Sequence, residues 1–163
     1  MTDTGLPVLK EWVVRVFYKK GFVDPLGEMA RRDMLDLGML DVTEVSMIPT
    51  YIINGSLNRE SVERACEELL ADPITQSYTV NAPPKLEDGW VVEVRLKPGV
   101  TDFVGESVKK GLAIIGISGV ESVKTGATYL IKGEMREEEL KFLCVKTIVN
   151  PLIHDFHIHG GKP

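Results

Sequence analysis

The chain has 163 residues, of which 44% are hydrophobic and 26% are charged, and its formal net charge is −5. These proportions are typical of a soluble globular protein, the acidic balance argues against a nucleic-acid-binding surface, and no apolar run approaches the ~18 residues that span a bilayer. The first residues show no basic patch before an apolar stretch, so we expect no signal peptide and a cytoplasmic location.

The stretch 12–80 is repeated without a gap at 90–158, so each predicted element occurs twice. Of the 69 residue pairs that this shift of 78 positions aligns, 19 are identical, where ordinary composition gives roughly 4. The chain therefore divides into a first repeat (1–80), a linker (81–89) and a second repeat with a short tail (90–163). Because a unit of about 70 residues buries only a thin core, we expect the repeats to pack together as an internal dimer about a pseudo-two-fold axis.

Each repeat begins with a predicted strand that is rich in β-branched and aromatic residues. The two segments are 12–18 (WVVRVFY) and 90–96 (WVVEVRL). A turn follows, and then Asp24 and Asp102 stand where an N-cap residue accepts hydrogen bonds from the free N–H groups of a helix. The helix has apolar residues spaced by 4, 4 and 3 positions, which indicates one buried face. They are Leu26, Ala30, Met34 and Leu37, matched by Val104, Val108, Leu112 and Ile115. Gly38 and Gly116 lie where a C-terminal cap glycine belongs.

A hairpin is predicted next, with strands at 42–47 and 50–54, because Ile48-Pro49 interrupts a run of strand-forming residues. The corresponding interruption in the second repeat is Gly126-Ala127. A second helix follows, which a proline ends in each repeat. The bounds of this helix are about 60–71 and 138–149, with an inner face of Val62, Ala65, Cys66 and Leu69, matched by Leu140, Leu143, Cys144 and Ile148. The last strands are at 77–80 and 155–158.

The predicted order is β-α-β-β-α-β, the split βαβ arrangement of the ferredoxin-like class. We therefore predict an α+β protein of two ferredoxin-like units packed as a pseudo-two-fold internal dimer. Since each helix has one apolar face, the helices should cover one side of the sheet. The second repeat is then the expected cover for the other side.

The two repeats differ in surface charge although they share an apolar pattern. The first repeat (12–80) has 7 Lys/Arg and 11 Asp/Glu, a net charge of −4, and the second repeat (90–158) has 9 of each, a net charge of 0. The two halves of a true homodimer cannot differ in this way, whereas two fused copies can. We therefore expect the repeats to face different partners.

Few side chains suggest chemistry of their own. Cys66 and Cys144 lie on the predicted inner helix faces, so we interpret them as small buried apolar residues. His157 and His159 would share one strand face, as two metal ligands could, but no third ligand is placed beside them, and we interpret them as a polar strand end. The acidic run 137–139 fits the first turn of a helix. We predict no catalytic, cofactor-binding or metal site.

Four residues are candidate contacts with a partner protein. They are equivalent in the two repeats and are not obviously part of a core. These residues are Lys19, Tyr51, Lys97 and Tyr129. The absence of a nucleophile, metal set or phosphate-binding loop indicates an interaction module rather than an independent enzyme.

Two short motifs resemble those of a known family. Segment 19–27 (KKGFVDPLG) and segment 69–74 (LLADPI), with Tyr78 beyond them, resemble PurS, the small subunit of bacterial and archaeal phosphoribosylformylglycinamidine synthase. The PurS pattern is approximately K-x-G-V-x-D-P-x-G after the first strand and L-L-A-N-P near the last. The second repeat has it at 97–105 (KPGVTDFVG) and 149–153 (VNPLI), so the chain resembles a tandem duplication of PurS.

The resemblance implies a subunit without catalytic residues or cofactors of its own. PurS dimerises and bridges the glutaminase PurQ and the synthetase PurL. The complex, a ligase, uses glutamine, ATP and Mg²⁺ to make formylglycinamidine ribonucleotide in purine biosynthesis. The resemblance therefore implies a scaffold that supports ammonia transfer between two enzymes and that could associate further with itself.

Two other classes share the predicted fold. A regulatory module of the ACT type also pairs, and it would bind a small molecule in the loops after the first strands. An acylphosphatase-like enzyme would need an arginine in the turn after the first strand, and segments 19–22 and 97–100 contain none.

Overall fold

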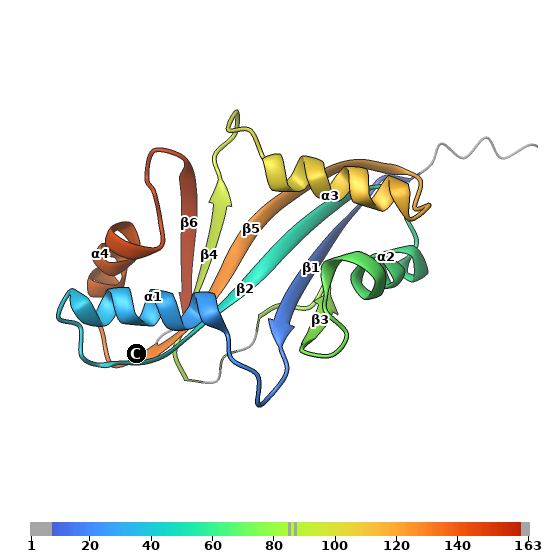
Figure 1. Ribbon diagram of the computed structural model, residues 1–163. Coiled ribbons are helices and arrows are strands. Elements are labelled where there is room, and N and C mark those ends of the chain that lie inside the picture. The colour runs from blue at the N-terminus through green and yellow to red at the C-terminus, as the bar shows by residue number, and fades with distance from the viewer. Residues whose placement is uncertain (1–7, 85, 87, 161–163) are drawn as a thin grey trace, which may run out of the picture.

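The computed structural model describes residues 8–84, 86 and 88–160. Within these residues the chain alternates between strands and helices (Figure 1). The elements are β1 (Lys10–Tyr18), α1 (Pro25–Asp36), β2 (Val42–Gly55), α2 (Arg59–Ala65), the π-helical turn η1 (Cys66–Leu70), β3 (Gln76–Val80), β4 (Trp90–Leu96), α3 (Phe103–Ile114), β5 (Val120–Gly133), α4 (Glu137–Thr147) and β6 (His154–Gly160). No helix among the described residues is long and apolar enough to cross a membrane.

The strands form one antiparallel sheet in the order β3-β1-β2-β5-β4-β6. Its centre is the pairing of β2 with β5, in which Pro49 lies opposite Ala127. These two residues are also equivalent under the shift of 78, so the pseudo-two-fold axis passes through their pair. The α+β class and the arrangement of two units about a pseudo-two-fold axis are therefore confirmed.

The predicted hairpin is wrong, because β2 and β5 are each one continuous strand of 14 residues. Pairing between β1 and β2 ends at Arg15 and Thr50. Backbone N–H groups point alternately to the two sides of a strand, and the N–H group of Met47, two residues before Pro49, is turned away from β5 to a side chain. The backbone nitrogen of Pro49 therefore faces the edge of β2 that β1 no longer pairs with. A proline, which has no N–H group, fits there without the loss of a ladder hydrogen bond. Each unit is thus β-α-β-α-β.

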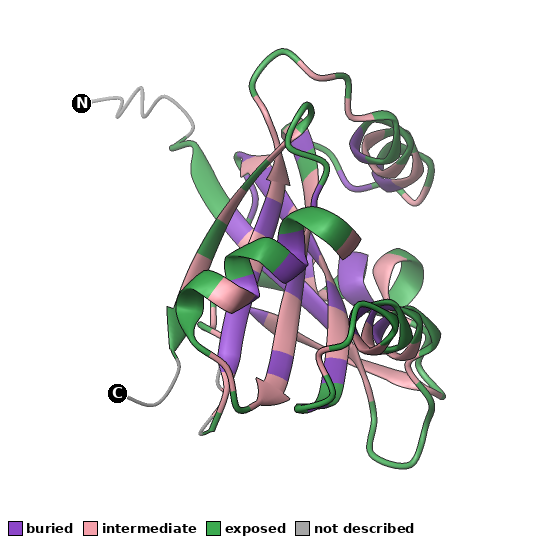
Figure 2. Cartoon of the chain, turned by 90° about the vertical axis from the view of Figure 1, so that its left-hand side faces the viewer, coloured by how far each residue is buried: buried purple, intermediate pink, exposed green. Residues whose placement is uncertain are grey.

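The second repeat extends the sheet instead of covering it, so the expected cover of the second sheet face is also wrong. Pairing of β2 with β5 along nearly their whole length satisfies the facing backbone edges of both strands and joins the repeats edge to edge. The four helices lie on one face of the sheet (Figures 1 and 2), and buried residues of the strands pack with residues of these helices in both cores. Residues 82–84 of the linker lie against the opposite face, here called the open face, where the Nη1 of Arg15 donates to the carbonyl of Ala82 at 2.9 Å.

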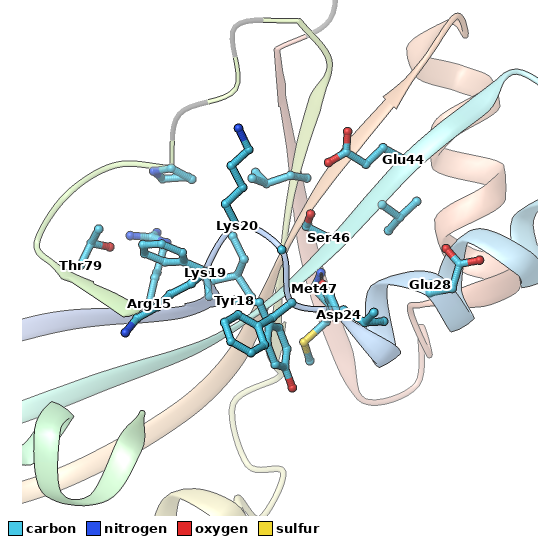
Figure 3. Close-up of a pocket in the computed structure, with 18 of the residues that line it drawn as sticks. Arg15, Tyr18, Lys19, Lys20, Asp24, Glu28, Glu44, Ser46, Met47 and Thr79 are labelled. Atoms are coloured by element: carbon cyan, nitrogen blue, oxygen red, sulfur yellow. Dashed lines mark hydrogen bonds between the residues drawn. The ribbon is translucent and has the colours of Figure 1, made fainter. Parts of the chain in front are cut away.

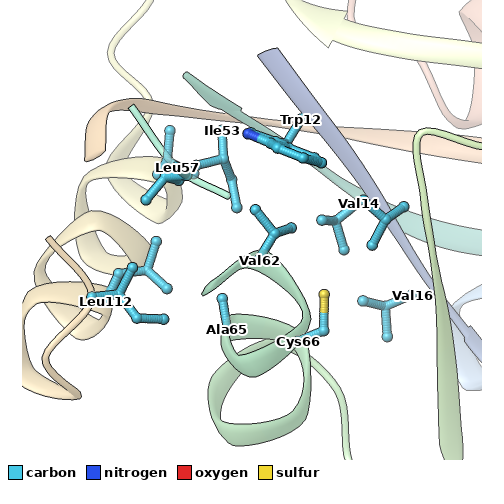
Figure 4. Packing of buried hydrophobic residues seen from close by; sticks show 12 residues of the cluster. Trp12, Val14, Val16, Ile53, Leu57, Val62, Ala65, Cys66 and Leu112 are labelled. Atoms are coloured by element: carbon cyan, nitrogen blue, oxygen red, sulfur yellow. The ribbon is translucent and has the colours of Figure 1, made fainter. Parts of the chain in front are cut away.

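The hydrophobic side chains form two cores, and each core draws on both repeats. In the first core, Val62 and Cys66 of the first repeat pack with Leu112 of α3 in the second (Figure 4). In the second core, Met34 of α1 packs with Leu140 of α4. Because a helix from each repeat completes the core of the other, the two repeats stabilise each other.

Local signals for the helix ends are confirmed. Asp24 and Asp102 are the N-caps of α1 and α3, and Gly38 and Gly116, just after these helices, have φ of 91° and 82°. The predicted inner face is wrong at Leu69, which is exposed. The π-helical turn that follows α2 adds a residue to the turn, so Leu70 packs against the core in its place.

Candidate functional site

One aspartate in each repeat fixes the first helix of that repeat to the strand beneath it. One carboxylate oxygen of Asp24 accepts from the N–H of Gly27 at 2.8 Å, and the other accepts from the N–H of Met47 at 2.7 Å. Asp102 makes the same bonds in the second repeat, at 2.7 Å and 2.6 Å. Each aspartate therefore satisfies a free donor of the helix and a free donor at the edge that β2 or β5 exposes where the first strand ends.

Glycine three residues later allows the close approach of helix and strand. A Cβ atom on Gly27 would lie 2.4 Å from the carbonyl oxygen of Val45, and one on Gly105 would lie 2.3 Å from that of Val123. Side-chain carbons do not approach backbone oxygens so closely, so both positions require glycine. The D-x-x-G segment that both repeats share, Asp24 to Gly27 and Asp102 to Gly105, therefore has a structural role. It fixes the position of the turn that precedes the helix.

A cavity lies where β1 leaves β2 (Figure 3). It encloses about 920 Å³ between the turn after β1, the first half of β2 and the linker. Phe17, Tyr18 and Phe22 supply aromatic walls, and Pro83 and Pro84 of the linker close one side. The equivalent region of the second repeat, beside Asp102 and Thr125, has a smaller cavity of about 410 Å³.

A polar cluster lies on the open face beside the pseudo-two-fold axis. The Nη2 of Arg15 is 2.6 Å from Oε1 of Glu93, and the Nε of Arg15 donates to the hydroxyl of Thr128 at 3.3 Å. The hydroxyls of Thr50 and Thr128 are 2.9 Å apart. Desolvation of Glu93 raises the pKa of its carboxyl, but the hydrogen bond and charge of Arg15, with smaller contributions from a hydrogen bond to His159 and the charge of Arg95, outweigh this and lower the pKa below its usual value.

The predicted contacts Lys19 and Lys97 lie far apart. They belong to two turns, the first lysine turn (residues 19–24) and the second lysine turn (97–102), at opposite ends of the molecule (Figure 1). The backbone N–H of each lysine donates to the loop before the last strand of its own repeat, at 2.9 Å and 2.8 Å. That loop presents an exposed apolar side chain in both repeats, Ile74 at 73% and Leu152 at 84% exposure.

Tyr51 and Tyr129, the other predicted contacts, lie on the helix-covered side of the sheet. Both are half-buried, and each packs against one of the two cores. Burial raises the pKa of both phenols, and at Tyr129 the negative charge of Asp24 raises it further. The structure therefore separates the four candidates into two lysines in turns, of which Lys19 is exposed and Lys97 is half-buried, and two half-buried tyrosines beside the cores.

The cysteines are buried, and desolvation is the main cause that raises the pKa of each thiol to about 12. His157 and His159 share the open face of β6, where the Nε2 of His159 is 3.3 Å from Oε2 of Glu93. Among the described residues, no group of three or more side chains is placed to hold a metal ion.

Sequence reasoning missed the polar cluster. The signal was present, because Arg15 and Glu93 are the only charged residues of the aligned segments 12–18 and 90–96 that stand opposite each other, and they have opposite charges. Only the topology shows that these two positions lie side by side.

Comparison with known proteins gives two matches to one family model. PurS, described as phosphoribosylformylglycinamidine (FGAM) synthase, matches residues 11–84 and again residues 90–161. The PurS subunit of phosphoribosylformylglycinamidine synthase from Methanocaldococcus jannaschii is 33% identical over 76 residues, which are 44% of this chain and 92% of that protein. The subunit of the same name from Archaeoglobus fulgidus is 35% identical over 72 residues, 41% of this chain and 90% of its own length. Each of these two relatives therefore matches a length of this chain that corresponds to about one repeat.

Proposed function

The chain belongs to the PurS family as a tandem duplication, and on that premise we propose that it is a non-catalytic scaffold subunit of the FGAM synthase complex in cytoplasmic purine biosynthesis. It bridges the glutaminase PurQ and the synthetase PurL and supports the transfer of ammonia between them. Glutamine, ATP and Mg²⁺ bind to those enzymes and not to this subunit.

The position of the two lysine turns is the observation that carries this proposal. They are equivalent in sequence, related by the pseudo-two-fold axis and placed at opposite ends of one sheet. Their surroundings differ, since Pro25 and Lys20 near the first turn correspond to Phe103 and Pro98 near the second. Two similar but unlike ends suit a subunit that holds two different enzymes.

A reconstitution with PurQ and PurL from the same organism tests the scaffold role. Omission of this chain should lower glutamine-dependent FGAM synthesis by roughly tenfold or more, equivalent to about 1.4 kcal/mol, while synthesis from added ammonia persists. Unchanged glutamine-dependent turnover without the chain would refute the proposal.

Matched surface variants test the two ends separately. Lys19→Glu combined with Ile74→Asp alters the first end, and Lys97→Glu combined with Leu152→Asp makes the equivalent change at the second. Because loss of a central contact typically costs about 2 kcal/mol or more, each variant should bind one enzyme at least ~30-fold more weakly and leave the other unaffected. Isothermal titration of each variant with each enzyme measures this, and normal binding of both enzymes by both variants would exclude the lysine turns as contacts.

A further inference from the structure

Residues 15 and 93 occupy equivalent positions in the two repeats, yet one is arginine and the other glutamate. The pseudo-two-fold axis brings these equivalent positions together on the open face, where Arg15 and Glu93 form an ion pair at 2.6 Å. Two identical residues would meet here in a symmetric dimer. Position 15/93 therefore distinguishes a pair of unlike repeats from a pair of like repeats.

The ion pair is held in place by further hydrogen bonds. Arg15 is 8% exposed, and its guanidinium also donates to Thr128 and to the carbonyl of Ala82. Thr50 and Thr128, which are 3% and 1% exposed, bond to each other. The guanidinium is thus largely desolvated, with acceptors on β4, β5 and the linker.

A pair of like repeats would lose this arrangement. Two first repeats would place two arginines side by side in this poorly solvated position, and two second repeats would place two glutamates there. Like charges without a partner are strongly unfavourable in such surroundings. Part of the remaining contact does not discriminate, because Thr50 and Thr128, which bond to each other, are the same residue in both repeats.

We propose that the Arg15–Glu93 pair determines which repeats associate, so that a first repeat accepts a second repeat and rejects another copy of itself. The interaction surface is the β2–β5 pairing together with position 15 or 93 beside it on the open face, and the partner that it fits is a repeat with the opposite charge at this position. Such selection acts during synthesis, when the first repeat leaves the ribosome before the second and neighbouring chains offer identical first repeats.

A chain cut in the linker tests the proposal. A protease recognition sequence placed between residues 84 and 88 lets the folded protein be cleaved into two fragments, which are then unfolded and refolded together at equal concentration. The two fragments are not separated before refolding, because each core contains residues of both repeats. Native mass spectrometry distinguishes the like and unlike pairs by mass.

The ratio of unlike to like pairs, which is about one in a random mixture, should be roughly tenfold higher, which corresponds to about 1.4 kcal/mol. The neutral variant Arg15→Gln with Glu93→Gln should approach the random mixture, whereas the exchanged variant Arg15→Glu with Glu93→Arg should keep the preference. A random mixture from the unmodified fragments, or an unchanged preference in the neutral variant, would overturn the proposal.

The intact chain provides an independent measurement if the fragments do not reassemble. Arg15→Glu and Glu93→Arg each create a like-charge pair and should lower the melting temperature. The double exchange restores opposite charges and should recover more than half of the summed loss. A double variant whose loss equals the sum of the single losses would show that the two positions do not select each other.

Discussion

Gly27→Ala is expected to destabilise the protein although it adds only one methyl group. The new Cβ would lie 2.4 Å from the carbonyl oxygen of Val45 and 2.5 Å from a carboxylate oxygen of Asp24. Relief requires α1 to move away from β2 or Asp24 to turn aside. Either movement weakens the hydrogen bonds from Asp24 to Gly27 and Met47, which are now 2.8 Å and 2.7 Å long.

The size of the effect follows from three contributions. Overpacking against a rigid backbone costs about 1–3 kcal/mol, and loss of an N-cap costs about 1 kcal/mol more. Alanine offsets this by at most about 1 kcal/mol, because it is a better helix former than glycine. The free energy of unfolding should therefore fall by about 1–3 kcal/mol, which lowers the melting temperature by roughly 2–12 °C in a chain of this size.

Gly111→Ala is the matched control, since Gly111 also lies within a first helix. Its added Cβ would meet only the end of the Leu69 side chain, at 3.0 Å and 3.3 Å, which can rotate away. This variant should be as stable as the original protein, or up to about 1 kcal/mol more stable. Urea denaturation followed by circular dichroism measures both variants. If Gly27→Ala were no less stable than Gly111→Ala, the close approach of α1 to β2 would not be the reason for glycine at position 27.

Three further outcomes follow from the cores and the titrating groups. Leu112→Ala should lower the free energy of unfolding by about 2–5 kcal/mol. Because Leu112 joins the repeats in one core, circular dichroism and tryptophan fluorescence should report the same single transition. Two separate transitions would contradict the shared core. Cys66 and Cys144 should not react with a thiol reagent at pH 8 until the protein unfolds. Because folding raises the pKa of each thiol from 9.0 to about 12, the thiols' contribution to stability should be complete below pH 9 and be lost as the pH rises toward 12. Folding lowers the pKa of Glu93 from 4.5, so its contribution should be present above pH 4.5 and be lost on acidification, and Arg15→Gln should make stability less dependent on pH there, as urea titrations at several pH values would show.

The features that the sequence predicts correctly depend on neighbouring residues. Asp24 caps a helix and Gly38 ends it because the required geometry lies within a few residues of each. The first strands are recognisable because their pattern of β-branched residues reflects a half-buried surface. The same local reasoning places Cys66 correctly in the interior.

Features that depend on distant strands or on an irregular helix could not be predicted in this way. Pro49 resembles a chain break when only its neighbours are considered, and its tolerance in the middle of β2 depends on where β1 ends. Leu69 follows the helical spacing of the sequence, but a π-helical turn changes the direction of its side chain. The lysines at positions 19 and 97 are predicted as exposed by their type, whereas their positions at opposite ends depend on the order of strands in the sheet.

The charge difference between the repeats has a structural consequence. Near the lysine turns, Pro25 corresponds to Phe103 and Lys20 to Pro98, so the two ends of the molecule have diverged. A divergent pair of ends is useful to a scaffold only if every assembled molecule displays one end of each kind. Fusion ensures equal numbers of the two repeats, but it does not prevent like repeats of neighbouring chains from associating. The selection that we propose for the Arg15–Glu93 pair prevents this association, because the pair joins the two repeats at an equivalent position where identical residues would repel.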